Sequence, residues 1–153
     1  MSTLNDRHIT VLNGLIEAAL DSAQGYSDAA KSATSPRFKT LFERRAMTRR
    51  QLTAELQSEV RGLGGTPEDE VTIMASAHRM FVNLKNALAG SEQGIVDEVE
   101  AGEDHIKARF EAALQREQFS APVKDVVSRL YAGIKADHDQ MRDIKRDLKV
   151  HGI

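Results

Sequence analysis

Apolar residues recur every three or four positions along almost the whole chain, which is the spacing of one face of an α-helix. Val and Ile do not alternate with polar residues, and few turn residues mark hairpins, so strands are not indicated. We therefore predict an all-α protein. Five segments carry the helical spacing, namely residues 5–32, 36–63, 67–88, 91–117 and 122–148.

The breaks between the segments have local causes. Pro36 disfavours helical geometry in the residue before it and suits the first turn of the helix that follows. Gly64-Gly65 supplies the left-handed residue that helix C-termini favour. Thr66 is a good N-cap and Pro67 a good first residue, so we expect the third helix to start there.

Four of the segments are about 26 residues long, or roughly 40 Å of helix, and the third is somewhat shorter. Four long amphipathic helices with a helical connection between the second and third predict a ferritin-like four-helix bundle with an additional helix in the crossover. A five-helix array that runs up and down is the alternative, which the spacing does not exclude. Without a long linker, residues 1–153 are expected to form one domain.

Composition excludes several classes of function. The absence of Cys rules out thiol catalysis, disulfides and cysteine-ligated metal centres. The 21 basic and 23 acidic residues give a net charge of -2, so we expect no nucleic-acid binding. No run approaches the ~20 apolar residues of a membrane span, and we predict a cytoplasmic protein.

Three helices place a charged residue on the apolar face near the middle of the helix. His138 stands between Ile134 and Met141, while Arg45 and Glu103 interrupt the second and fourth segments. Since burying an unpaired charge is costly, we predict that Arg45, Glu103 and His138 form a buried polar network.

A metal site is the alternative, with Glu100, Glu103 and His138 as ligands for iron or manganese. An inward arginine argues against a dication, whose site concentrates negative charge. Di-iron bundles carry a Glu on two helices and a Glu-x-x-His motif on the other two. Because the chain contains no Glu-x-x-His, we expect no complete di-iron site and no bound cofactor.

Several motifs resemble one protein family over nearly the whole chain. The acidic run that ends in Gly-Glu-Asp is the most specific of them. They are Gln24-Gly25-Tyr26, Leu63-Gly64-Gly65-Thr66-Pro67, His78-Arg79-Met80-Phe81, Asp97 to Asp104 and His138-Asp139. The chain thus resembles a bacterial domain-of-unknown-function family of ferritin-like four-helix-bundle proteins, distantly similar to rubrerythrin.

The resemblance implies a ferritin-like fold with residues 67–88 in the crossover and an association with stress responses. It implies no reaction, because Thr48 and Gln51 stand where rubrerythrin has Glu-x-x-His, and Ala19 where it has a Glu ligand. We expect a non-catalytic binding or structural protein that forms a homo-oligomer, with a dimer favoured, or binds a protein partner. The alternatives are a metal-binding protein with a degenerate carboxylate and histidine site, and a small Dps-like cage.

Overall fold

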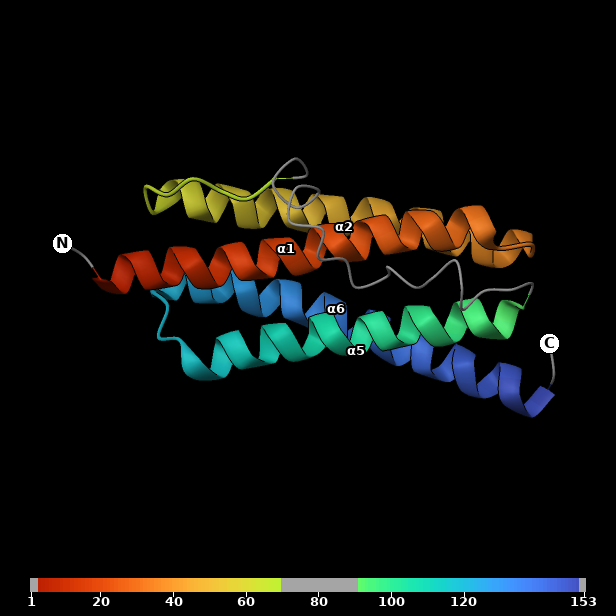
Figure 1. The fold of residues 1–153 in the computed structure, drawn as a ribbon. Coiled ribbons are helices and arrows are strands. Elements are labelled where there is room, and N and C mark those ends of the chain that lie inside the picture. The colour runs from red at the N-terminus through yellow and green to blue at the C-terminus, as the bar shows by residue number, and fades with distance from the viewer. Residues whose placement is uncertain (1–2, 70–90, 152–153) are drawn as a thin grey trace.

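The computed structural model describes residues 3–69 and 91–151, and within them the chain forms four long helices (Figure 1). The helices are α1 (Thr3–Ser32), α2 (Pro36–Gly62), α5 (Glu92–Arg116) and α6 (Ala121–His151). Their bounds confirm four of the five predicted segments to within three residues. The predicted helix over 67–88 falls almost entirely outside the described residues, and its first three residues are not helical.

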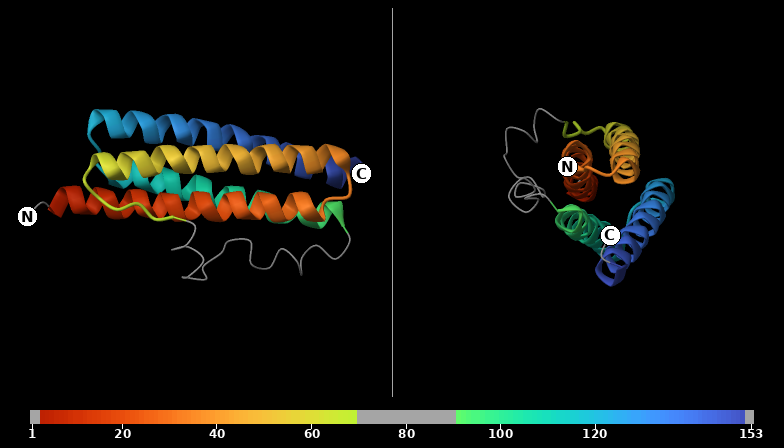
Figure 2. Two further views of the ribbon diagram at one scale, coloured as in Figure 1. Left: turned by 90° about the horizontal axis from the view of Figure 1, so that it is seen from above. Right: turned by 90° about the vertical axis from the view of Figure 1, so that its right-hand side faces the viewer.

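The helices form a four-cornered bundle in which α1 packs on α2 and α5, and α6 packs on α5 and α2 (Figure 2). Every packed pair is antiparallel, whereas α2 and α5 point the same way, since α5 begins at the end of the bundle opposite to the end of α2 (Figure 1). The connection between them therefore has to return along the length of the bundle. These directions are those of the ferritin-like topology. The five-helix up-and-down array differs from it only in residues 67–88, which lie almost entirely outside the described residues.

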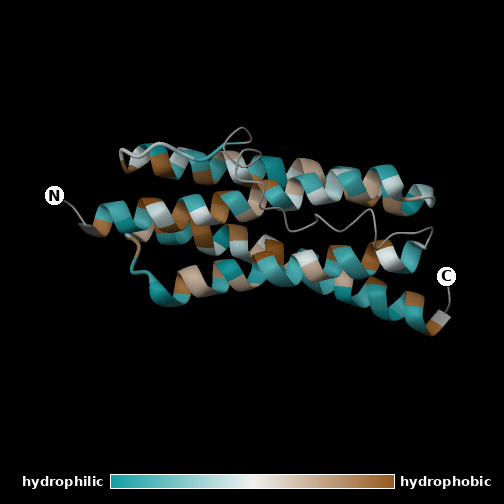
Figure 3. Cartoon of the chain, viewed as in Figure 1, coloured by the Kyte–Doolittle hydropathy of each residue, from teal (hydrophilic) through white to brown (hydrophobic). Residues whose placement is uncertain are grey.

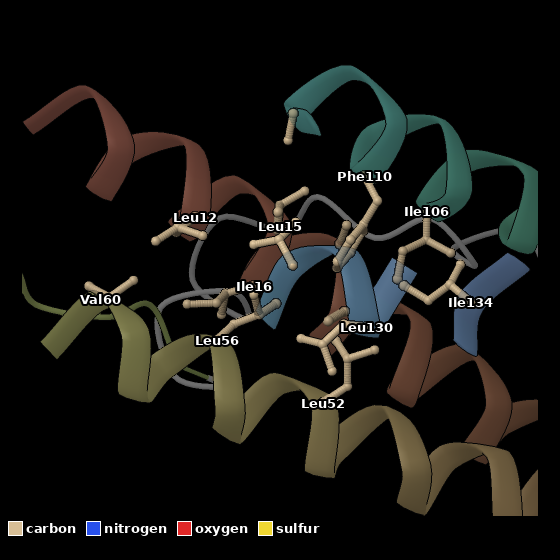
Figure 4. Close-up of a cluster of buried hydrophobic side chains, with 14 of the residues drawn as sticks. Leu12, Leu15, Ile16, Leu52, Leu56, Val60, Ile106, Phe110, Leu130 and Ile134 are labelled. Carbon is tan, nitrogen blue, oxygen red and sulfur yellow. The ribbon is translucent and has the colours of Figure 1, made fainter. Parts of the chain in front are cut away.

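Two apolar clusters fill the interior. One lies towards the start of α1 and contains Leu12, Ile16, Leu56, Phe110 and Leu130 among others (Figure 4). The other contains Tyr26, Phe42, Val99, Met141 and Leu148 among others. Brown apolar bands alternate with teal polar ones along all four helices, as amphipathic helices require (Figure 3).

The end of α2 has the geometry predicted for its glycines. Gly64 takes a φ of 84°, a left-handed conformation that side chains disfavour. Its N–H donates to the carbonyl of Arg61 and the N–H of Gly65 donates to Val60, which is the Schellman pattern. A Cβ on Gly65 would lie 2.8 Å from the side chain of Ile9, so only glycine allows the chain to cross α1 this closely.

The residues after α2 run along α1 and are held by its asparagines. Asn5 donates to the carbonyl of Leu63 at 2.7 Å. Two turns further on, Asn13 donates to the carbonyl of Thr66 at 3.2 Å and accepts from the N–H of Glu68 at 2.8 Å. The first part of the crossover is thereby held against α1.

At the opposite end of the bundle, Glu92 joins the start of α5 to the turn between α1 and α2. Its Oε1 accepts hydrogen bonds from Thr34 N at 2.7 Å, Thr34 Oγ1 at 2.6 Å and Ser35 N at 3.3 Å. Burial by itself raises the pKa of Glu92, but the hydrogen bonds from Thr34 and Ser35 outweigh it and hold this pKa below its usual value. The ionised carboxylate is therefore favoured by folding.

We predict that Glu92→Gln lowers the free energy of unfolding at pH 7 by about 1 kcal/mol, because the amide keeps only neutral hydrogen bonds. A carboxylate whose pKa is lowered by folding stabilises the protein above its unfolded pKa and loses that effect as pH falls through its folded pKa. The difference in free energy of unfolding between wild type and variant should thus disappear as the pH falls below about 4.5. Urea titrations at pH 7 and pH 3 measure it, with Glu43→Gln, on the exposed side of α2, as the control. An equal gap at both pH values would contradict the prediction.

Candidate functional site

A layer of polar side chains crosses the middle of the bundle and separates the two apolar clusters. All four helices contribute to it, and we call it the central ion layer. Its members are Ser22 and Tyr26 from α1, Arg45 and Arg49 from α2, Glu103 from α5, and Asp137 and Gln140 from α6.

The pair of Arg49 and Glu103 forms the centre of this layer. Arg49 is 0% exposed and Glu103 is 1% exposed. The two groups meet end on through two parallel hydrogen bonds, with Nη1 to Oε1 at 2.6 Å and Nη2 to Oε2 at 2.9 Å. Arg49 also donates to Ser22 Oγ at 2.7 Å and to Asp137 Oδ2 at 3.0 Å. Only its Nε–H has no partner among the described residues.

Arg45 extends the layer one turn along α2. Its Nη1 donates to the Tyr26 hydroxyl at 3.2 Å and lies 3.5 Å from Glu103 Oε2. Its Nη2 donates to Gln140, and its Nε lies 3.5 Å from Asp137 Oδ2. Both guanidinium groups lie 5.5 Å from the centre of the Tyr26 ring, within the range of cation–π attraction.

The charges of the layer balance one another. Burial lowers the pKa of Arg49, but the attraction of Glu103 outweighs this and keeps the pKa above its usual range. Burial and the nearby Glu103 carboxylate both raise the pKa of the Tyr26 hydroxyl, which is therefore neutral. Arg45 and Arg49 face the two acids Glu103 and Asp137, so the formal charges of these four side chains sum to zero.

Sequence spacing could have identified two members of the layer that the prediction did not include, Arg49 on α2 and Asp137 on α6. On α2 the buried positions follow alternating steps of three and four residues through Phe42, Arg45, Arg49, Leu52 and Leu56. The same alternation on α6 leads from Ile134 through residue 137 to Met141. Strict counting therefore favours Asp137 over its neighbour as the inward residue.

The structure brings Arg45 and Glu103 together but places His138 elsewhere. His138 lies between α5 and α6 on the outer side of the central ion layer, with 12% of its side chain exposed. Its Nε2 lies 2.5 Å from Asp104 Oδ1 and 3.7 Å from Glu100 Oε2, and its Nδ1 lies 3.1 Å from Asp139 Oδ1. Of the three predicted residues, Arg45 and Glu103 thus lie together with Arg49 and Asp137, and His138 lies apart from them.

The residues around His138 form a second polar group, which we call the α5–α6 cluster: Glu100, Asp104, His138, Asp139 and Lys145. Lys145 Nζ lies 3.1 Å from Glu100 Oε1, and this hydrogen bond raises the pKa of Lys145. Hydrogen bonds from His138 and then Lys135 lower the pKa of Asp139 to about 2. One ligand atom each of Glu100, Asp104 and His138 lie within 4.8 Å of one another.

The predicted metal set of Glu100, Glu103 and His138 is thus divided between the two groups. Both oxygens of Glu103 are bound by Arg49, whereas Glu100 and His138 belong to the α5–α6 cluster. Asp104 takes the place that the prediction gave to Glu103. Thr48 and Gln51, which the resemblance set at ligand positions of the second helix, are exposed.

The central ion layer does not fit a di-metal centre. Such a centre uses four carboxylates and two histidines that face inward. The acids of the central ion layer are Glu103 and Asp137, both already bound to arginine. Asp137 and Gln140 keep the i, i+3 spacing of Glu-x-x-His on α6, but a shorter acid and an amide replace its two ligands. Adding a dication would leave a buried excess of positive charge.

The fold defines a ferritin-like bundle, and among the described residues its central ion layer holds two arginines and two acids. The chain is similar in structure to a mutant of the Dps1 protein of Mycobacterium smegmatis, with a TM-score of 0.79 and 9% sequence identity over 95% of this chain and 99% of that chain. At this identity the likeness shows the fold alone.

The sequence pattern of a family described as Domain of unknown function (DUF2383) matches residues 7–116. The chain belongs to this family, which confirms the resemblance to a domain-of-unknown-function family inferred from its motifs. No curated protein matches it significantly in sequence. None of the described helices is long and apolar enough to span a membrane.

We predict that Arg49→Met lowers the free energy of unfolding by about 3–5 kcal/mol, because it leaves the Glu103 carboxylate buried without its main partner. Adding Glu103→Met should restore most of this loss, since Arg45 and Asp137 remain as a balanced pair. Urea denaturation of both variants measures the effect.

The exposed neighbour Arg44 provides the control, and Arg44→Met should change stability by less than about 0.5 kcal/mol. If the double variant with Arg49→Met and Glu103→Met were no more stable than Arg49→Met alone, the unpaired Glu103 carboxylate would not be the cause of the lost stability.

Proposed function

We propose that this protein is a non-catalytic binding or structural module in the cytoplasm, in which an ionic layer takes the place of an inner metal centre. The observation that carries the proposal is the burial of Arg49 between Glu103 and Asp137 at the middle of the bundle. A guanidinium neutralises carboxylates as a metal would, but it offers no open coordination position for oxygen or another substrate.

Access to the layer supports the same proposal. Arg49 and Glu103 have almost no exposed surface, so no described side chain of the central pair meets solvent. Loading a dication would require both oxygens of Glu103 to leave Arg49 and would strand that guanidinium in the core. Breaking a buried pair in this way costs about 3–5 kcal/mol before any metal bond forms.

The proposal expects function to come from association rather than from chemistry. Met47 on α2 is 62% exposed and is one of three large apolar side chains that lie open among the described residues. It borders a shallow hollow between α1 and α2 that Ala30, Ala46 and Lys39 also line. We therefore propose that the outer side of α2 binds a second copy of the chain.

We predict that the His138→Ala variant, which lacks the histidine of the α5–α6 cluster, binds no stoichiometric iron or manganese when it is purified without chelator. It should also show no oxygen-dependent oxidation of added Fe²⁺ above the buffer rate. Elemental analysis and absorbance of ferric iron measure the two quantities. Stoichiometric iron in this variant would contradict the proposal, because only the central ion layer then remains to hold it.

We predict that the chain is a dimer in solution, with about twice its mass of 16.9 kDa by light scattering after size-exclusion chromatography. Met47→Lys should give monomers, because it sets a third positive charge between Arg44 and Arg50 on the same side of α2. Leu4→Lys, an equally exposed apolar position near the start of α1, is the matched control and should leave the dimer intact. A cage of many subunits, or a monomeric wild type, would contradict the dimer.

A further inference from the structure

The α5–α6 cluster brings one imidazole and two carboxylates to one point outside the central ion layer. Glu100 and Asp104 are four residues apart on α5 and lie on the same side of that helix. His138 reaches them from α6, with Nε2 at 2.5 Å from Asp104 and 3.7 Å from Glu100. The three ligand atoms lie within 4.8 Å of one another, a span that a single ion can bridge.

Both ring nitrogens of His138 face carboxylates. A neutral imidazole donates from one nitrogen and carries a lone pair on the other. A proton on Nε2 makes the 2.5 Å contact with Asp104 a hydrogen bond, and an ion that binds here takes the place of that proton. Nδ1–H then donates to Asp139, at 3.1 Å, and the lone pair of Nε2 faces the ion together with oxygens of Asp104 and Glu100. A lone pair and two anionic oxygens facing one another are a set of metal ligands. A carboxylate behind the ligating histidine, here Asp139, is the usual way to fix its orientation.

The contacts around the cluster leave carboxylate oxygens available to a cation. Lys145 binds Oε1 of Glu100 and leaves Oε2 turned towards His138. Asp104 is 58% exposed, so water can reach the point where the three groups meet and complete the coordination of an ion. Glu103 is excluded from this point, because a rotation of about 100° per residue along α5 turns it into the core while Asp104 turns outward.

We propose that Glu100, Asp104 and His138 bind one first-row transition-metal dication at the α5–α6 edge, with Asp139 as a positioning residue. An imidazole nitrogen beside two carboxylates suits zinc, iron or manganese better than magnesium or calcium, which take oxygen ligands. The site shares no side chain with the central ion layer, and the proposed function does not depend on it.

Calorimetric titration of the full chain with Zn²⁺ tests the site. We expect one zinc ion per chain in the wild type, and binding weakened about tenfold or more by Asp104→Asn or His138→Ala. Asp104 is largely exposed, so its amide variant should fold normally and circular dichroism should be unchanged. Millimolar Mg²⁺ should not displace the zinc.

Two variants on the same helices serve as matched controls. His105→Ala removes the imidazole next to Asp104 on α5, and Asp143→Asn removes an exposed carboxylate one turn beyond Asp139 on α6. Both should bind zinc as the wild type does. Zinc binding that persists in His138→Ala, or that falls equally in the His105 variant, would overturn the site, as would the absence of binding in the wild type.

The role of Asp139 has its own readout. Asp139→Asn should weaken zinc binding by about 10–100-fold while leaving one site per chain. The visible spectrum of bound Co²⁺ should shift in this variant, because the imidazole is no longer held at its angle, and it should be lost altogether in His138→Ala. An unchanged affinity and spectrum in Asp139→Asn would show that Asp139 does not position the histidine.

Discussion

The buried pair of Arg49 and Glu103 is the constraint on which the rest of the structure depends. An unpaired charge in the core is costly, so the helices have to pack in the one register that brings α2, α5, α6 and α1 together at this guanidinium. Apolar side chains alone permit several registers, because one leucine packs much like another. The central ion layer therefore favours the arrangement in which its charges are paired, and it separates the two apolar clusters.

The same pair determines which chemistry the centre of the bundle can perform. Carboxylate bundles neutralise their inward acids with metal ions, which also supply open coordination positions for substrates. Two guanidinium groups neutralise Glu103 and Asp137 equally well and supply none. Asp104 and His138, which offer possible ligand atoms, each come one residue after a member of the layer, Glu103 or Asp137. They meet on the outer side of the layer.

The four described helices and their ends could be predicted from the sequence, because apolar spacing, Pro36 and Gly64 act locally. The ferritin-like bundle was also predicted, from the four long helices and the resemblance of the motifs, whereas the site depended on tertiary packing. Arg45 and Glu103 were correctly expected to face inward, but His138 was chosen over Asp137 although the two differ by a single residue. One residue is a rotation of about 100°, which decides between core and surface. Between Ile134 and Met141 both residues fit steps of three and four, and only the alternation followed along the whole of α6 separates them.

The 9% identity to a chain of nearly the same fold shows what the fold requires and what it leaves open. Alternating steps of three and four between apolar residues are enough to bring four long helices together. At the polar middle the fold requires only that the buried charges sum to about zero, which metal ions with carboxylates and arginines with carboxylates both satisfy. Under the proposed function, the second solution keeps the bundle and takes the place of an inner metal centre. Function in such a bundle therefore has to be argued from the charges at its middle and not from its shape.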